Sequence, residues 1–196
     1  QAAEEGKGAM ISAYYIESQA AYTRARKLAE WMREQGLEAA SNAQIAIKPW
    51  LEKNGIGRAG RNSLIAIPGL GSRFHVQVIL TDAELGDHGF ETEDNDLCAR
   101  CHACAAACPT GAILPGGKID IDICLRARGE GEVVPEELRP LYENRLLGCE
   151  ICQNVCPRNA GSGARDMPPA LAEALNLKSL LRGEMGRLAE LVGKNY

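Results

Sequence analysis

Eight cysteines, all between residues 98 and 156, constrain this chain of 196 residues more than any other feature of its sequence. The first four have the spacing C-x2-C-x2-C-x3-C and are followed by Pro109. The last three have the spacing C-x2-C-x3-C and are followed by Pro157, while Cys124 lies alone between the two groups. Proline lacks a backbone N–H and fixes φ, so we expect the chain to turn sharply after each group.

This spacing is that of bacterial iron–sulfur ferredoxins, in which the cysteine before the proline binds the other of two clusters. A 4Fe–4S cluster needs four thiolates, one for each iron. A single tight loop with three cysteines can bind three of the irons but cannot also reach the fourth. The rule predicts two clusters with these ligands: Cys98, Cys101, Cys104 and Cys156 for the first, and Cys108, Cys124, Cys149 and Cys152 for the second.

Zinc, disulfides and buried thiols are the alternative interpretations of these cysteines. Four-cysteine zinc sites usually use two separated pairs, not three evenly spaced cysteines followed by a Cys-Pro. Disulfides suit small secreted domains, and the chain shows no apolar secretory segment. His102 lies between two predicted ligands, and with eight cysteines available we interpret it as a spacer.

The composition is ordinary for a globular protein, with 45% apolar and 24% charged residues. The formal charge of −4 counts the cysteines as neutral, and bound clusters would make it more negative. Bulk charge therefore argues against nucleic acid as a partner, although it leaves a local basic patch open. No run is long enough to span a membrane, and exposed clusters need a reducing compartment, so we expect a cytoplasmic protein without a membrane partner.

The hydrophobic patterns predict an α+β fold in three parts. These are an α/β domain at residues 1–92, a ferredoxin-like double-cluster domain at residues 93–165 and a C-terminal helical segment at residues 166–196. In the first part we expect frayed residues at 1–8, strands at 9–16, 63–67 and 74–81, an ambiguous short strand at 44–47, and helices at 19–35, capped by Ser18, and 49–53. Residues 84–96 resemble a linker. Later we expect a short hairpin around 113–123, a helix at 135–142 and two short helices after residue 168.

A glycine loop, Gly55-Ile-Gly-Arg-Ala-Gly60, matches the G-x-G-x-x-G pattern. In a dinucleotide-binding fold this pattern follows a strand, but residues 50–54 do not resemble one, so a dinucleotide site is not predicted. The glycines instead predict a tight loop that approaches another group closely. Arg58, Arg61 and Asn62 on this loop could bind an anionic or amide-rich ligand, or the loop is a plain surface turn. His75 is interpreted as a packed or exposed strand residue.

Two segments carry a resemblance to a known family. Residues 136–159, which include N-R-L-L-G-C-E-I-C-Q-N-V-C-P-R-N, resemble the second cluster segment of epoxyqueuosine reductases. Residues 53–64 resemble the glycine loop of the same family, and Thr81-Asp82 with Leu85 is similar to the corrinoid reductive dehalogenases, which share this half of the fold. The resemblance covers about residues 9–192.

The resemblance implies a nitroreductase-like α/β domain that holds a corrinoid (cobalamin), reduced by low-potential electrons from the two clusters. Carried over by position, Arg61 and Ser63 would contact the corrinoid. The family also has a long segment before the strand at Ala9 and a catalytic aspartate where this chain has Ser41. We therefore expect an N-terminally shortened relative and not an epoxyqueuosine reductase itself.

Three functions follow as hypotheses. The first is a corrinoid-dependent reductase supplied by an electron-donor protein, acting on a small-molecule substrate. The second is a non-catalytic ferredoxin-type electron carrier or subunit. The third is a cluster protein that serves tRNA modification. The missing part of the corrinoid pocket would also allow a homodimer, in which a second copy completes it.

Overall fold

The computed structural model describes residues 9–41, 43–86, 98–131, 133–162, 169–184 and 186–192. The fraying expected for residues 1–8, and most of the linker expected at 84–96, lie outside these ranges. The mixture of helices and small sheets confirms the predicted combination of helix and strand, while the three domain boundaries and the nitroreductase-like arrangement stay predictions. Within the described residues, no helix is both long and apolar enough to cross a membrane.

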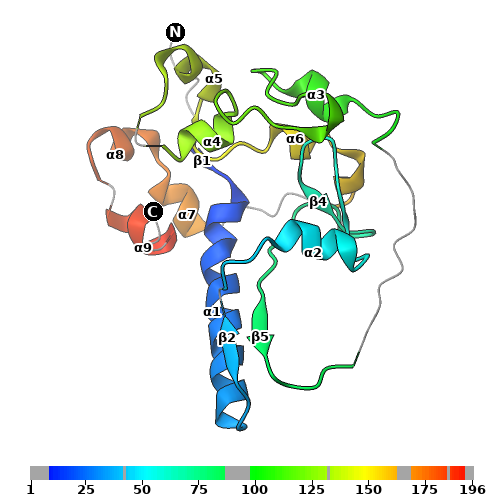
Figure 1. Ribbon diagram of the computed structural model, residues 1–196. Helices are drawn as coiled ribbons and strands as arrows, with labels where there is room; N and C mark the ends of the chain where they lie inside the picture. Colours follow the sequence, from blue (N-terminus) through cyan, green and yellow to red (C-terminus); the bar gives the residue numbers. More distant parts are fainter. Residues whose placement is uncertain are drawn as a thin grey trace.

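A long helix, α1 (Ala13–Glu34), is the axis of the molecule (Figure 1). It begins six residues earlier than predicted, and the strand expected at 9–16 is reduced to β1 (Met10–Ile11). Two side chains stabilise the start of α1. The Ser12 hydroxyl accepts a hydrogen bond from the N–H of Tyr14 at 3.3 Å, and the Glu150 carboxylate accepts one from the first helical N–H at 3.1 Å. Ser18, which we predicted as the cap, is instead buried inside the helix.

The end of α1 agrees with the prediction, because Gly36 follows it in the left-handed region at φ 85°. The chain then returns along the helix as β2 (Ala39–Ser41), which pairs antiparallel with β5 (Ile79–Thr81). Both strands lie beside the lower half of α1 in Figure 1. Ser41, at the position of the family's catalytic aspartate, therefore lies in a strand opposite Ile79.

The strands of the first half are shorter than predicted. No strand forms at 44–47, and the segments predicted at 63–67 and 74–81 keep only β4 (Ile65–Ala66) and β5 as strands. β4 pairs antiparallel with β3 (Arg58–Ala59), so the glycine loop at residues 55–60 contains the first strand of a small hairpin, whose turn lies at residues 60–64. Residues 74–78 have strand-like residues but find no ladder partner among the described residues, which explains the overprediction.

A second helix, α2 (Ile47–Lys53), precedes the glycine loop. It begins two residues before Pro49, where we had predicted its start, and ends at Asn54-Gly55 as predicted. The N–H groups of Ile56 and Gly57 both bond the carbonyl of Leu51, so the chain folds back tightly from the helix into the hairpin.

The cysteine-rich half consists of short helices joined by turns. The α-helices are α3 (Ala103–Ala107), α4 (Leu125–Gly129), α5 (Arg139–Tyr142) and α6 (Ile151–Asn154), and the 3-10 helices are η1 (Pro115–Gly117), η2 (Glu136–Leu138) and η3 (Pro157–Asn159). The predicted hairpin is present as an antiparallel bridge between Ile113 and Ile119. The predicted helix at 135–142 is confirmed as η2 followed directly by α5. A strand, β6 (Arg145–Leu147), pairs parallel with β1.

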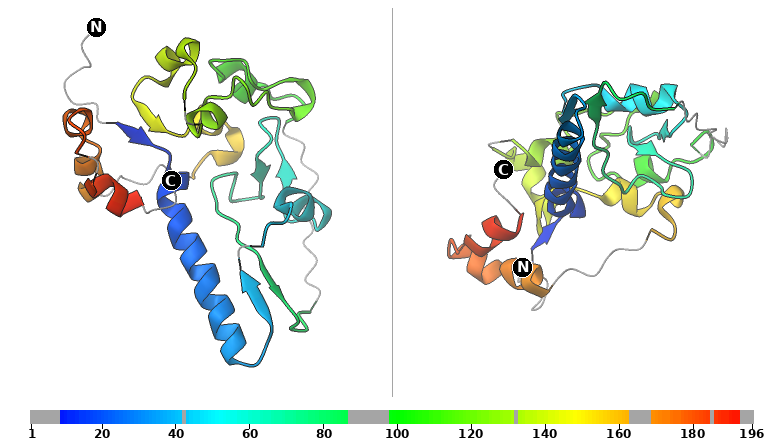
Figure 2. Two further views of the ribbon diagram at one scale, coloured as in Figure 1. Left: turned by 60° about the vertical axis from the view of Figure 1, so that its left-hand side comes forward. Right: turned by 90° about the horizontal axis from the view of Figure 1, so that it is seen from below.

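In the described part of the C-terminal segment, three helices, not two, pack against the start of α1: α7 (Pro169–Ala174), α8 (Leu177–Leu181) and α9 (Gly186–Val192). The extra break falls at Asn176, whose side chain accepts hydrogen bonds from the N–H groups of Lys178 and Ser179 and so starts α8. The core between these helices and α1 is made of apolar side chains: Ala9, Ile11, Tyr15, Leu171, Ala174, Leu175 and Leu188. Figure 2 shows this helical group on the opposite side of α1 from α2 and the β3–β4 hairpin.

Candidate metal centre

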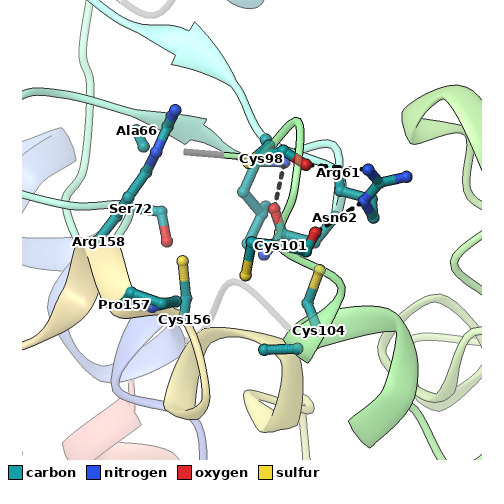
Figure 3. A pocket seen from close by; sticks show the side chains of 13 residues that line it. Arg61, Asn62, Ala66, Ser72, Cys98, Cys101, Cys104, Cys156, Pro157 and Arg158 are labelled. Carbon is teal, nitrogen blue, oxygen red and sulfur yellow. Dashed lines mark hydrogen bonds between the residues drawn. The ribbon is translucent and has the colours of Figure 1, made fainter. Parts of the chain in front are cut away.

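The structure brings four cysteines from two distant segments to one pocket. Cys98, Cys101 and Cys104 come from the turn before α3 and from α3 itself, and Cys156 comes from the turn after α6 (Figure 3). Helices α3 and α6 pack against each other, which holds the two segments together. These are the four residues that the spacing rule grouped for the first cluster.

The remaining four cysteines are connected by electrostatic interactions. The thiol of Cys149 interacts with Cys124 and Cys108, and the thiol of Cys152 interacts with Cys149, with Cys104 of the first group and with Cys124. Cys124 immediately precedes α4, and Cys152 lies within α6. All eight cysteines are free thiols, so the structure pairs none of them in a disulfide.

Burial raises the pKa of three of these thiols. It raises the pKa of Cys104 and Cys149, and it raises the pKa of Cys152 from 9.0 to about 11 although a hydrogen bond from Asn62 opposes it. Cys108 behaves differently. Burial alone would raise its pKa, but hydrogen bonds from the Thr110 side chain and from the backbone N–H groups of residues 110–112 lower it overall. Metal binding to the three thiols with a raised pKa must therefore displace protons.

A single zinc ion and a four-iron cube require different spacings of their sulfur ligands. A zinc ion holds four sulfurs at about 2.3 Å, which places the sulfurs within about 4 Å of one another. Among the residues that the structure describes, no three Cys, His, Asp or Glu side chains converge tightly enough to hold one metal ion. A four-iron cube, with one thiolate on each iron, spreads its sulfur ligands more widely.

The glycine loop is fastened to the cysteine-rich half. The Arg61 guanidinium donates hydrogen bonds to the carbonyl oxygens of Cys98 and Cys101, at 2.9 and 3.1 Å. The Ser63 hydroxyl donates to the carbonyl of Gly117. Arg61 therefore braces the backbone of the first cysteine turn (Figure 3). The role of Arg61 and Ser63 as corrinoid contacts stays a prediction, since both side chains are used here by the cysteine-rich half.

The sequence did not predict a second set of hydrogen bonds between the two halves, which is made by Asn159. This buried amide accepts a hydrogen bond from the N–H of Ser72 at 2.7 Å and donates one to the carbonyl of Gln153 at 2.9 Å. It thereby joins the turn at residues 67–72 to the loop that carries Cys156. The signal available was Asn159 itself, directly after the Cys-Pro-Arg segment, but nothing in the sequence pointed to Ser72 as its partner.

A group of aromatic and charged residues near Cys124 was also missed. Tyr14 stacks on His75 with ring centroids 4.6 Å apart, and the Arg126 guanidinium lies 5.0 Å from the centroid of Tyr14. Arg126 also pairs with Glu130 at 3.2 Å. Burial lowers the pKa of His75, although Glu17 opposes this. His75 is thus packed against an aromatic ring, as we interpreted it, but outside a strand.

Comparisons with known proteins agree with this geometry. A family model described as a 4Fe-4S double cluster binding domain matches residues 97–159. The epoxyqueuosine reductase of Aliivibrio fischeri is 40% identical over 121 residues, which are 60% of this chain and 32% of that protein. The Escherichia coli epoxyqueuosine reductase is also 40% identical over 121 residues, 31% of its length. The chain thus spans about a third of the length of the curated relatives it matches.

Solved structures give the same result for the fold. An epoxyqueuosine reductase from Bacillus subtilis has a TM-score of 0.65 and 26% identity, over 79% of this chain and 43% of that one. An epoxyqueuosine reductase bound to a modified tRNA-Tyr stem loop has a TM-score of 0.64 and 25% identity, over 83% of this chain and 43% of that one. A catabolic reductive dehalogenase shares the fold, with a TM-score of 0.58 and 24% identity over 93% of this chain and 27% of that one.

These matches define the class of one part of the protein: residues 97–159 match a double 4Fe–4S cluster binding domain. More particularly, the chain is a homologue of epoxyqueuosine reductases, which confirms the resemblance seen in the cysteine and glycine-loop motifs. Shortening at the N-terminus stays a prediction.

Proposed function

We propose that this protein transfers low-potential electrons through two 4Fe–4S clusters to an acceptor at its α/β part. The first cluster would be held by Cys98, Cys101, Cys104 and Cys156, and the second by Cys108, Cys124, Cys149 and Cys152. The observation that carries the proposal is the convergence of three cysteines of one group and the last cysteine of the other on a single pocket. When bound, the clusters supply one-electron transfer, and reducing conditions such as those of the cytoplasm would keep them intact.

The residues of this chain support such a centre in three ways. Arg61 fixes the carbonyls of the first cysteine turn, so that its thiols keep one arrangement. Asn159 fixes the loop that supplies the fourth thiol. The buried Cys104 and the half-buried Cys152 keep part of each site away from water, which lets hydrogen bonds to sulfur act strongly on the potential.

Metal analysis of anaerobically reconstituted protein tests the proposal. About eight irons and eight sulfides per chain are expected from two four-iron clusters. Cys124→Ala and Cys156→Ala should each lose one cluster and keep about four irons, because each removes a ligand of a different group. His102→Ala is the matched control, since it alters a residue between two ligands and should keep both clusters. Stoichiometric zinc, or a Cys124→Ala variant with both clusters, would overturn the assignment.

The identity of the electron acceptor distinguishes a corrinoid-dependent reductase from a ferredoxin-type carrier or subunit. A corrinoid-dependent reductase, like the reductive dehalogenases and epoxyqueuosine reductases that the sequence resembles, would hold cobalamin near the glycine loop. The two predicted contacts, Arg61 and Ser63, already bind backbone carbonyls of the cysteine-rich half. Both bonds tie the glycine loop to the cysteine-rich half, and we derive no step through a corrinoid. The second function is a ferredoxin-type carrier or subunit.

Cobalamin added to the reconstituted protein distinguishes these functions. A change in the visible spectrum of the corrinoid, with co-elution on gel filtration, would support the reductase. No binding at high micromolar cobalamin would support the carrier. Light scattering on the same samples tests whether a second copy completes a pocket, since a homodimer that forms only with cobalamin is the expected sign of a shared site.

RNA is a further candidate partner. The solved epoxyqueuosine reductase with a tRNA stem loop shows that a protein of similar fold binds RNA. The net charge of −4 argues against RNA binding here, but it does not exclude a basic patch. A filter-binding titration with a tRNA anticodon stem loop at two salt concentrations tests this, because phosphate contacts make the affinity fall steeply as salt rises.

A further inference from the structure

Thr110 places a hydroxyl group beside the sulfur of a predicted ligand of the second cluster. Its side-chain oxygen lies 3.5 Å from Sγ of Cys108, and the two side chains form a hydrogen bond. Burial would raise the pKa of Cys108, but this side chain and the backbone N–H groups of residues 110–112 lower it overall. A sulfur bound to iron carries no proton and can only accept, so the hydroxyl is the donor once a cluster is bound.

The turn that carries Thr110 is held in place by its neighbours. The N–H of Gly111 donates a hydrogen bond to the carbonyl of Cys108 at 3.2 Å, which closes the turn. The next residue, Ala112, is 1% exposed, and its carbonyl accepts a hydrogen bond from the N–H of Asp120 at 2.8 Å. These contacts fix the backbone of Thr110 and so keep its hydroxyl beside the sulfur.

The turn after the last cysteine offers no equivalent hydroxyl. In this second Cys-Pro turn, Arg158 stands at the position of Thr110, and Asn159 follows it. Neither of these side chains carries an O–H group. The contact is thus specific to one of the two predicted sites, the one to which Cys108 belongs.

We propose that Thr110 raises the reduction potential of the second cluster through an O–H···S hydrogen bond to Cys108. The inference rests on the proposed function, because it requires a cluster bound at Cys108. Reduction adds one electron to the cluster and increases the negative charge on its sulfur ligands. A donor held against one of these sulfurs stabilises the reduced form more than the oxidised form, so its removal lowers the potential.

The competing explanation is that Thr110 only shapes the turn. Three uncharged variants separate the two roles, and the backbone donors of the turn stay in place in all of them. Thr110→Val has nearly the same shape and removes the hydroxyl, whereas Thr110→Ser keeps the hydroxyl and removes the methyl group. Thr110→Ala removes both. The matched control is Thr81→Val in strand β5, because the Thr81 hydroxyl also bonds two residues along the chain, accepting from the N–H of Ala83 at 3.1 Å.

The experiment is a potentiometric titration of the reconstituted full chain with dithionite, followed by EPR, after iron analysis. We expect all variants to hold about eight irons. Thr110→Val and Thr110→Ala should make reduction of one cluster about tenfold less favourable, which is ~59 mV for a one-electron couple. Their other cluster should be unchanged, and so should both clusters of Thr110→Ser and Thr81→Val.

Two double variants assign the shift to a cluster. When Thr110→Val is combined with Cys156→Ala, which removes a ligand of the first cluster, the shifted midpoint should persist. When it is combined with Cys124→Ala, which removes a ligand of the second, the remaining midpoint should equal that of the wild type. The opposite pattern would place the effect of Thr110 on the first cluster and overturn the inference.

Three further results would overturn it: wild-type midpoints in Thr110→Val, a shift in Thr110→Ser as large as that in Thr110→Val, or an equal shift in Thr81→Val. If Thr110→Val does not assemble both clusters, Thr110→Ala decides by the same criteria. If both variants fail to assemble, the position is required for assembly and the tuning role is rejected. A wild-type protein without two clusters would instead overturn the proposed function.

Discussion

Gly71→Ala should damage the first cluster site, and Gly69→Ala should not. Both glycines have left-handed backbones, with φ of 75° and 74°. A Cβ on Gly71 would lie 2.2 Å from Oδ1 of Asn159 and 2.6 Å from the carbonyl oxygen of Arg158, whereas a Cβ on Gly69 would meet nothing within 4 Å. The two substitutions therefore share the same backbone cost and differ only in the collision with the loop that carries Cys156.

The size of the difference can be worked from these contacts. The left-handed backbone costs an alanine about 1–2 kcal/mol at either position, so it cancels in the comparison. At Gly71 the collision adds about 1–3 kcal/mol of overpacking. Displacement of Asn159 also breaks its bonds to Ser72 and Gln153, at about 1 kcal/mol each. Gly71→Ala should thus be less stable than Gly69→Ala by about 3–5 kcal/mol, the sum of these terms.

Two measurements check this prediction. Urea unfolding of the reduced, metal-free proteins gives the difference in the free energy of unfolding. Iron analysis after reconstitution should give about eight irons for Gly69→Ala and about four for Gly71→Ala, because the displaced loop carries Cys156 two residues before Arg158. Equal stability and equal iron content in the two variants would refute the reasoning, since it would mean that the turn at residues 67–72 does not support the cluster loop.

Three further predictions concern the core, the thiols and the brace. Leu175 is 1% exposed, so Leu175→Ala should lower the free energy of unfolding, measured by urea titration, by about 2–5 kcal/mol. Leu181 is 80% exposed, so Leu181→Ala should change it by less than about 0.5 kcal/mol. The metal-free protein should lose stability as the pH rises from 9 to about 11, since the raised pKa of Cys152 favours the neutral thiol in the fold and this contribution is complete only below pH 9. Cys152→Ala should reduce that loss by about 2–3 kcal/mol, measured by urea unfolding at pH 8 and pH 11, and an unchanged loss would contradict the burial of this thiol. Arg61→Lys should slow reconstitution of one cluster, measured by absorbance. A lysine cannot bond both carbonyls of the first cysteine turn as the guanidinium does. Equal rates for the wild type and the variant would show that the hydrogen bonds of Arg61 are dispensable.

The features that the sequence predicted well depend on local rules. Spacing placed Cys98, Cys101, Cys104 and Cys156 in one group, and these four line one pocket; the two ligand sets stay a prediction, based on the few ways in which tight loops supply four thiolates to a four-iron cube. Gly36 and Asn54-Gly55 ended their helices as expected, since only glycine enters the left-handed region at low cost. These rules involve neighbours in the chain, so one sequence contains all the information they need.

The features that it predicted poorly depend on partners far along the chain. The start of α1 is set by Glu150, 137 residues from the N–H it binds. The strand expected at 74–81 was cut to Ile79–Thr81 because only that part meets β2. The bonds of Arg61 to the first cysteine turn span about 40 residues. Periodicity describes a segment's own faces, but it does not tell which other segment will lie against them.

The junction of β1, the start of α1 and β6 has a consequence for how the protein matures. Met10 lies beside Arg145, the Ser12 hydroxyl donates to Glu150, and a Cβ on Gly148 would lie 2.7 Å from the ring of Tyr15. The backbone around Cys149 is thus supported by residues translated more than 130 positions earlier. During synthesis on the ribosome, the first helix has no such partner until the segment up to residue 150 has emerged. Iron delivery to the second site should therefore follow the emergence of that segment, and a chaperone that shields the unpartnered helix would improve the yield of loaded protein.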